Sequence, residues 1–286
     1  MGAACRARVR VRIRRSIARL ASSRSTASTG FRVLTYHSVT EGLVGDRGEM
    51  TIQRELLDEQ LHRIRSRGWS IIDADGAVGG IGSGGVLPAP AIVLTFDDGF
   101  ADNHERLLPL LERHGVSATV FVPAAELVAG SWGSPRGAPD RLDLGRAREM
   151  LATGRVAFGC HGATHRTLRG LRPETLRTEC REAKLRLEDA LGREVPLFAY
   201  PFGAPDSWDR QVRSAVVDAR YRGAFTSLFG ANDVGADPFL LRRCRVSWAE
   251  DLRSFDALLD GRYDWYRGYQ WLRASLPGIA RRGYAE

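Results

Sequence analysis

The stretch Ala91–Gly99 constrains the fold of this chain more than any other part of the sequence. It reads Ala-Ile-Val-Leu-Thr-Phe-Asp-Asp-Gly, and its apolar, partly β-branched residues predict a short buried strand. Two adjacent carboxylates, Asp97 and Asp98, follow at once. Burying neighbouring carboxylates is unfavourable unless a cation or hydrogen bonds compensate them. The pair therefore indicates either a solvated turn, in which Asp and Gly are common, or a metal site with a neighbouring base.

Strand and helix patterns alternate along the rest of the chain, which predicts an α/β fold with a parallel sheet, either a barrel or an open sheet. Further strands are expected at residues 31–37, 69–72, 117–122, 155–159, 197–200, 221–226 and 240–246. Helices are expected at residues 51–67, 103–113, 140–152, 173–192, 208–220 and from about 249 onward. The glycine- and proline-rich residues 76–90 and 130–139 are expected to be loops. In both folds, functional residues gather at the carboxyl ends of the strands.

The net charge of +8 belongs to the start of the chain. Nine arginines lie between Arg6 and Arg32, before the first acidic residue, Glu41; the remaining 33 basic residues face 34 acidic ones. This distribution gives no reason to expect nucleic-acid binding. Residues 1–30 are predicted to form a basic tail and linker, either a short amphipathic helix on an anionic membrane surface or a disordered arm.

Residues 31–286 are expected to form the main domain, with a helical, aromatic-rich extension from about residue 249. No apolar run is long enough for a membrane span, and none has the form of a secretory signal. A cytoplasmic or membrane-peripheral location is therefore expected. The four cysteines are scattered without a C-x-x-C pair, which argues against a zinc ribbon and provides no disulfide framework.

Two histidines, His161 and His165, follow the predicted strand 155–159 at a spacing of four residues. Neutral imidazole is a common metal ligand, and two histidines with one carboxylate leave a position open on the metal. An H-x3-H pattern alone is a weak signal. Here it gains weight because both this pair and the Asp97-Asp98 pair follow predicted strands.

Together, Thr95-Phe-Asp-Asp-Gly99 and His161-x3-His165 resemble the polysaccharide deacetylase family, the NodB-homology or carbohydrate-esterase-4 group. Segments 34–39, 200–203 and 240–246 are similar to further parts of that family, so the resemblance spans about residues 32–246. It implies a distorted (β/α)7 barrel. It also implies a hydrolase that removes N-acetyl groups from amino sugars of a polysaccharide or glycan precursor.

The same resemblance implies roles for individual residues. Asp97 is expected to be the general base. Asp98, His161 and His165 are expected to hold one divalent ion, with zinc the first choice. The backbone N–H of Phe202 is expected to stabilise the oxyanion.

The sequence departs from the family in two places. Ala199 stands where the family usually has an arginine, so Arg243, on another strand, is a candidate for orienting the base. The usual late histidine is missing, which makes His37 a candidate general acid, although it could equally be a buried structural histidine. Tyr200 and Trp132 are candidate substrate contacts, or core residues.

Two other functions remain open from the sequence. One is amide hydrolysis on a small cyclic imide or ureide within the same family. The other is a non-catalytic, carbohydrate-binding relic of the fold. The intact carboxylate pair and both histidines argue against a relic, whereas the missing acid and Ala199 keep it open.

Overall fold

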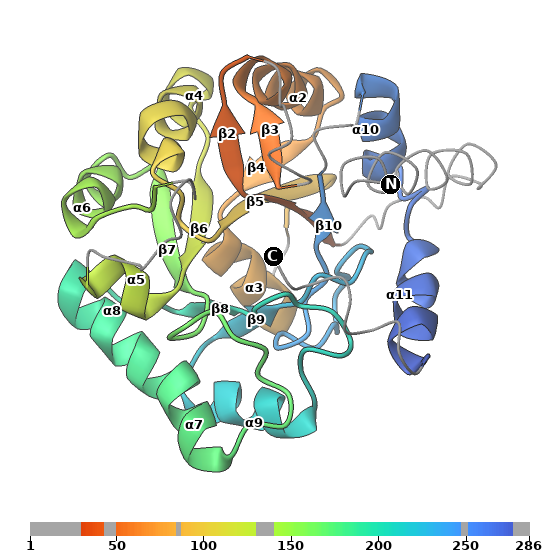
Figure 1. Ribbon diagram of the computed structural model, residues 1–286. Coiled ribbons are helices and arrows are strands. Elements are labelled where there is room, and N and C mark those ends of the chain that lie inside the picture. The colour runs from red at the N-terminus through yellow and green to blue at the C-terminus, as the bar shows by residue number, and fades with distance from the viewer. Residues whose placement is uncertain (1–29, 43–49, 84–86, 130–139, 247–250, 277–286) are drawn as a thin grey trace, which may run out of the picture.

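A computed structural model describes residues 30–42, 50–83, 87–129, 140–246 and 251–276 of this chain. Residues 1–29 of the predicted tail, and Trp132, lie outside this part. An eight-stranded, fully parallel sheet forms its centre (Figure 1). Its strands are β1 (Phe31–Tyr36), β4 (Ser70–Ile72), β5 (Ala91–Asp97), β6 (Ala118–Val122), β7 (Val156–Cys160), β8 (Leu197–Ala199), β9 (Gly223–Phe225) and β10 (Cys244–Arg245). They run in the order β10-β1-β5-β6-β7-β8-β9, and β4 pairs with the first half of β5.

The sheet curls so that its two ends approach each other. The segment before β10 pairs with β9 through a parallel bridge between Phe225 and Leu241. There the Thr226 N–H donates to the Leu241 carbonyl at 2.7 Å, and the Leu241 N–H donates to the Ala224 carbonyl at 2.9 Å. The predicted α/β fold with a parallel, barrel-like sheet is therefore confirmed.

Helices surround the sheet in Figure 1. They are α2 (Arg54–Ser66), α4 (Leu108–His114) after a π-helical turn η1 (Asn103–Leu107), α5 (Ala124–Ala129), α6 (Leu144–Ala152), α7 (Pro173–Arg177), a second π-helical turn η2 (Thr178–Glu182), α8 (Ala183–Leu191), α9 (Arg210–Asp218), α10 (Leu252–Leu259) and α11 (Tyr266–Ser275). The run from α7 to α8 matches the helix predicted for residues 173–192, and it buries Leu176, Cys180, Ala183, Leu187 and Leu191. None of the helices in the described ranges is both long and apolar enough to cross a membrane.

One predicted loop was wrong, because residues 74–83 form helix α3 (Ala74–Ser83). This helix contributes Ala74, Ala77, Val78 and Ile81 to a cluster inside the curl of the sheet, with Phe31 and other residues of β1, β5 and β8. The glycines disfavour a helix by about 1 kcal/mol each relative to alanine. Burial of the i, i+3, i+4, i+7 apolar stripe outweighs that preference, and the loop prediction gave the glycines too much weight.

Two helix starts were also placed too early. Thr51 belongs to strand β3 (Thr51–Gln53), which pairs with β2 (Ser38–Thr40), so α2 begins only at Arg54. Helix α6 begins at Leu144, where Asp143 rather than Asp140 caps it by accepting the Arg146 N–H at 2.9 Å.

Residues 140–142 are instead extended beside the turn that follows β5. The Leu142 N–H donates to the Gly99 carbonyl and the Ala101 N–H to the Asp140 carbonyl, both at 2.8 Å. These bonds delay the start of α6 and bring Arg141 next to the carboxyl end of β5. The parallel register also places the carboxyl ends of β5, β7 and β8 at one edge of the sheet.

Candidate metal centre and active site

The turn after β5 aims both carboxylates at this edge. Asp97 is the last residue of β5, and Asp98 and Gly99 both have a left-handed backbone, with φ of 74° and 61°. Asp tolerates this conformation better than most residues. A Cβ on Gly99 would lie 2.6 Å from Val122 Cγ1, so glycine is needed there for space as well as for backbone conformation. The local sequence Asp-Asp-Gly therefore suits a sharp turn that keeps both carboxylates buried.

Asp97 is bound by Arg243. The Arg243 guanidinium donates two hydrogen bonds to the Asp97 oxygens at 2.7 and 2.8 Å, and its Nε donates to the Thr226 carbonyl at 2.9 Å. Both side chains are buried. Burial alone would raise the pKa of Asp97, but the charges of Arg243 and His161 outweigh it and hold that pKa below its ordinary value. Asp97 is thus an oriented, ionised carboxylate.

Asp98, His161 and His165 converge beside this pair. Each offers one ligand atom, and the three atoms lie within 4.8 Å of one another. His165 Nε2 is 3.1 Å and His161 Nε2 is 3.7 Å from Asp98 Oδ1. The structure thus brings the predicted ligand set together.

Hydrogen bonding fixes the tautomer of His161. Its Nδ1 lies 2.7 Å from the Ala199 carbonyl, which can only accept, so Nδ1 carries the proton and Nε2 keeps a free lone pair. Burial lowers the pKa of His161 to about 4, so the ring is neutral near pH 7. That is the form in which imidazole binds a metal.

The loop that carries His165 is organised by Glu179, a buried residue of η2. Its carboxylate accepts the main-chain N–H groups of Ala163 and Thr164 at 2.8 and 3.0 Å, and the Thr164 hydroxyl at 2.6 Å. Glu179 was not singled out from the sequence. The only available signal was an acid close to the apolar face of a predicted helix.

The three residues fit a divalent cation. Asp98 Oδ1 is buried and accepts no hydrogen bond, although His165 Nε2 is only 3.1 Å away. An unpartnered carboxylate oxygen facing two imidazole nitrogens is unfavourable without a cation. Two nitrogen donors and one oxygen donor are a set that suits zinc and leaves further positions open.

His37 follows β1 and lies near the carboxylates. Burial lowers its pKa, whereas the charges of Asp98 and Asp97 act to raise it. Within the described ranges, its ring forms no ion pair with either aspartate; its carbonyl accepts from Asn103 Nδ2 at 3.0 Å. His37 therefore adjoins the site, and in the described part of the chain it makes no ion pair or hydrogen bond with Asp97.

The remaining candidates differ in position. The ring of Phe202 lies 5.0 Å from that of His165, and its backbone is left-handed with φ of 63°. Tyr200 is fully buried, stacks on Trp208 and donates its hydroxyl to the Phe239 carbonyl at 3.0 Å. Of the two roles predicted for Tyr200, this burial and these contacts favour a core residue over a substrate contact.

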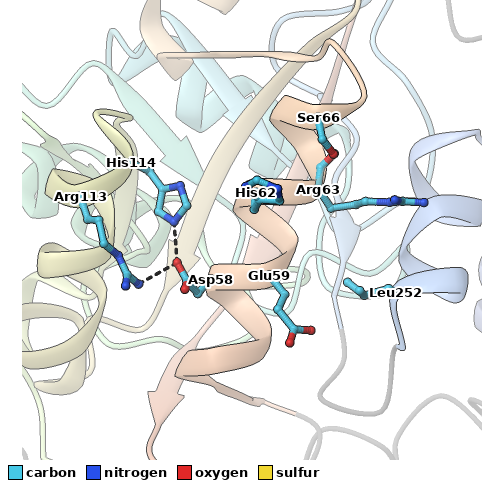
Figure 2. Close-up of a pocket in the computed structure, with 8 residues that line it drawn as sticks. All are labelled: Asp58, Glu59, His62, Arg63, Ser66, Arg113, His114 and Leu252. Carbon is cyan, nitrogen blue, oxygen red and sulfur yellow. Dashed lines mark hydrogen bonds and ion pairs between the residues drawn. The ribbon is translucent and has the colours of Figure 1, made fainter.

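A pocket elsewhere is chemically different (Figure 2). It lies between α2, α4 and the start of α10 and is lined by Asp58, Glu59, His62, Arg63, Ser66, Arg113, His114 and Leu252. Its central carboxylate, Asp58, is already paired with His114 at 2.6 Å and Arg113 at 2.7 Å. In the part of the chain described, only Asp98, His161 and His165 group as a possible metal site.

Fold and site together define an α/β barrel-like protein with a candidate metal centre at its strand ends. Residues 84–224 match the family model described as "Polysaccharide deacetylase". Residues 84–224 thus belong to the polysaccharide deacetylase family, which confirms the resemblance drawn from the sequence and implies a glycan substrate.

Individual relatives agree with this assignment. The chain is 22% identical over 228 residues to "Putative polysaccharide deacetylase YxkH" of Bacillus subtilis (strain 168), covering 80% of this chain and 75% of that protein. It is 30% identical over 103 residues to the poly-β-1,6-N-acetyl-D-glucosamine N-deacetylase of Escherichia coli (strain K12), covering 36% of this chain but 14% of that protein. Deacetylase PplD of Streptococcus pyogenes, solved with acetate, is similar with a TM-score of 0.71 at 19% identity, covering 82% of this chain and 99% of that one. The last likeness shows the fold.

Proposed function

We propose that this chain is a metal-dependent hydrolase that removes N-acetyl groups from amino sugars of a polysaccharide or glycan precursor. One observation carries the proposal: the two neighbouring carboxylates after β5 contact different partners. Asp97 is held by Arg243 at 2.7 and 2.8 Å, whereas Asp98 faces two imidazoles. This division suits a base beside a metal ligand.

Asp98, His161 and His165 would hold one divalent ion, and zinc is the ion that this donor set favours. When bound there, the ion would lower the pKa of water and polarise the amide carbonyl. His161 is ready for this role because its Nδ1 is committed to the Ala199 carbonyl.

Asp97 would take the proton of the attacking water. Its lowered pKa keeps it ionised at neutral pH, and Arg243 fixes the direction of its oxygens. The water oxygen then bonds to the acetyl carbon, the C–N bond breaks, and acetate and a free amine leave. The backbone N–H of Phe202 is proposed to stabilise the oxyanion.

The leaving amine needs a proton, and two residues could provide it. His37 is one, because it lies close enough for both aspartates to act on its pKa. Asp97 is the other, because it could return the proton that it took from water. Both assignments are proposals. Replacing His37 should slow turnover if His37 is the acid and should leave turnover unchanged if Asp97 is the acid.

The substrate class rests on the relatives. The Escherichia coli protein is named for poly-β-1,6-N-acetyl-D-glucosamine, and the matched segment covers 14% of it. We therefore propose an N-acetylated amino-sugar polymer or its precursor, and the linkage is left to experiment. The basic residues 1–30 are proposed to bind an anionic membrane surface.

A substrate panel tests the proposal. Acetate release is measured with β-1,6- and β-1,4-linked N-acetylglucosamine oligomers, and ring opening with a small cyclic imide and a ureide, with Asp97→Asn as the control. Acetate release that depends on Asp97 supports the proposal. Turnover of only the cyclic compounds would favour the small-amide hydrolase, and bound metal without any turnover would favour the relic.

A further inference from the structure

Two charged side chains beside the metal centre have no part in the function proposed above. Arg141 comes from the extended segment before α6, and Glu126 comes from α5, a helix that the sequence did not predict. Their side chains are 18% and 4% exposed. Neither residue belongs to the motifs that identify the family, so their position beside Asp98 calls for an explanation of its own.

Arg141 contacts Asp98 at both main chain and side chain. Its Nη1 donates to the Asp98 carbonyl at 2.8 Å and lies 3.8 Å from Asp98 Oδ2. The guanidinium stacks on Phe100, with its central carbon 4.0 Å from the ring centroid. An antiparallel bridge between Phe100 and Arg141 fixes the backbone that carries this side chain. Arg141 is therefore held from both sides in contact with a proposed metal ligand.

Asp98 needs such support because of its conformation. Its φ of 74° lies in the left-handed region, which a residue other than glycine keeps only where its surroundings hold it. A rotation of this residue would move Oδ1 away from His161 and His165. The hydrogen bond from Arg141 to the Asp98 carbonyl opposes that rotation directly, because the carbonyl belongs to the rotating peptide.

Glu126 is placed to act on Arg141. Its Oε2 lies 3.5 Å from Arg141 Nε, and both of its oxygens are buried and accept no hydrogen bond. Burial raises the pKa of Glu126 to about 7, and the charge of Arg141 opposes this rise. Because Glu126 accepts no hydrogen bond, its carboxylate acts on Arg141 through the ion pair between Oε2 and Nε. Its attraction draws the guanidinium into place.

We propose that Arg141 is a positioning residue for Asp98, and that Glu126 acts through Arg141 by holding the guanidinium against the Asp98 carbonyl. The inference rests on the proposed function, because it takes Asp98 to be a metal ligand. It adds two residues, from segments far from the family motifs, whose loss should weaken metal binding without removing a ligand.

The test is the zinc affinity of metal-free protein, measured by competition with a chromophoric chelator near neutral pH. Arg141→Met should bind zinc about 10–100-fold more weakly, the usual effect of losing a residue that orients a ligand. Arg146→Met is the matched control, because Arg146 pairs with Glu105 and Asp143 at the surface. Its zinc affinity should equal that of the unaltered chain.

Two further variants keep the test decisive if Arg141→Met does not fold. Arg141→Lys keeps the charge but lacks the planar fork that reaches Asp98 and Glu126 together, so its affinity should be intermediate. Glu126→Gln should weaken zinc binding when Arg141 is present. It should not weaken zinc binding further in the Arg141→Met background, because Glu126 is proposed to act only through Arg141 and the two effects should therefore not add. Circular dichroism of each variant establishes that it is folded.

The outcomes separate this inference from the proposed function. Equal zinc affinity of folded Arg141→Met or Arg141→Lys and the unaltered chain would overturn the role of Arg141. A full Glu126→Gln effect in the Arg141→Met background would overturn the claim that Glu126 acts through it. Failure of the unaltered chain to bind zinc would overturn the metal centre and this inference together. Zinc binding without deacetylation would overturn the proposed function alone.

Discussion

Replacing Arg243 by methionine should destabilise the protein, most at neutral pH and less as the pH is lowered. The Arg243 side chain is 1% exposed and makes two hydrogen bonds to Asp97, which is 6% exposed. Methionine fills a similar volume but carries no charge. The variant would therefore leave the Asp97 carboxylate buried without its cation.

The expected loss of folding free energy is large for a single substitution. Removing one partner of a buried ion pair typically costs about 3–5 kcal/mol of folding free energy. Each kcal/mol shifts the melting temperature of a large domain by about 2–4 °C, so the melting temperature of the variant should fall by roughly 6–20 °C. Surface substitutions usually stay within about 0.5 kcal/mol, so an effect of this size is easily distinguished.

The pH dependence follows from the pKa of Asp97. In the unaltered protein this pKa is lowered, because Arg243 and His161 outweigh burial. The pair therefore adds stability above the unfolded-state pKa of about 3.9, and this stability is lost as the pH falls through the lower folded-state pKa. Without Arg243, burial should raise the folded-state pKa instead. The ionised carboxylate then costs stability at neutral pH, and protonation relieves that cost as the pH is lowered.

Urea unfolding of metal-free protein, followed by circular dichroism at about pH 7 and about pH 5, measures both effects. The double variant Asp97→Asn/Arg243→Met is the control, because it removes both charges and should recover part of the loss. An Arg243→Met variant within about 0.5 kcal/mol of the unaltered protein would refute the reasoning. So would an equal loss at both pH values.

Three further predictions concern the acid, the histidine loop and the tail. His37→Ala should keep the metal, slow turnover and flatten the basic limb of the pH–rate profile; an unchanged rate and profile would assign the acid role to Asp97. Glu179→Ala should weaken zinc binding about 10–100-fold, because two amides of the loop before His165 lose their acceptor, and an unchanged zinc affinity would contradict this. Deleting residues 1–30 should abolish binding to anionic vesicles and leave turnover of soluble oligomers intact. The electrostatic attraction lost is about 1 kcal/mol for each arginine near the membrane surface. Salt-insensitive vesicle binding by the full chain would argue against an electrostatic tail.

Much of the fold could be read from the sequence because it depends on local patterns. The strand of β5 is a continuous apolar run, and the alternation of strands and helices predicted a parallel sheet. Helix α3 was missed because its glycines resemble a loop, whereas its stability comes from burial inside the curl of the sheet. That burial depends on strands distant in sequence.

The site shows the same division between local and distant information. The histidine pair and the carboxylate pair were found because spacing and position after strands mark them, and the resemblance to the family assigned Asp98 to the ligand set. Arg243 was a candidate only as a replacement for a missing arginine, and the structure places it on Asp97. Glu126, Arg141 and Glu179 could not be found, because each is a charged residue on an ordinary segment. Their burial and partners exist only once η2, α5 and the segment before α6 meet the strand ends.

Restoration of metal-free protein by zinc tests the central claim most directly. Zinc is added in steps to the chelator-stripped chain, and both bound metal and acetate release from N-acetylglucosamine oligomers are measured at each step. We predict that acetate release rises with occupancy and stops rising at one ion per chain, and that His165→Ala shows neither binding nor release. Full acetate release before any zinc is bound, or a His165→Ala variant that binds zinc as tightly as the unaltered chain, would contradict the account.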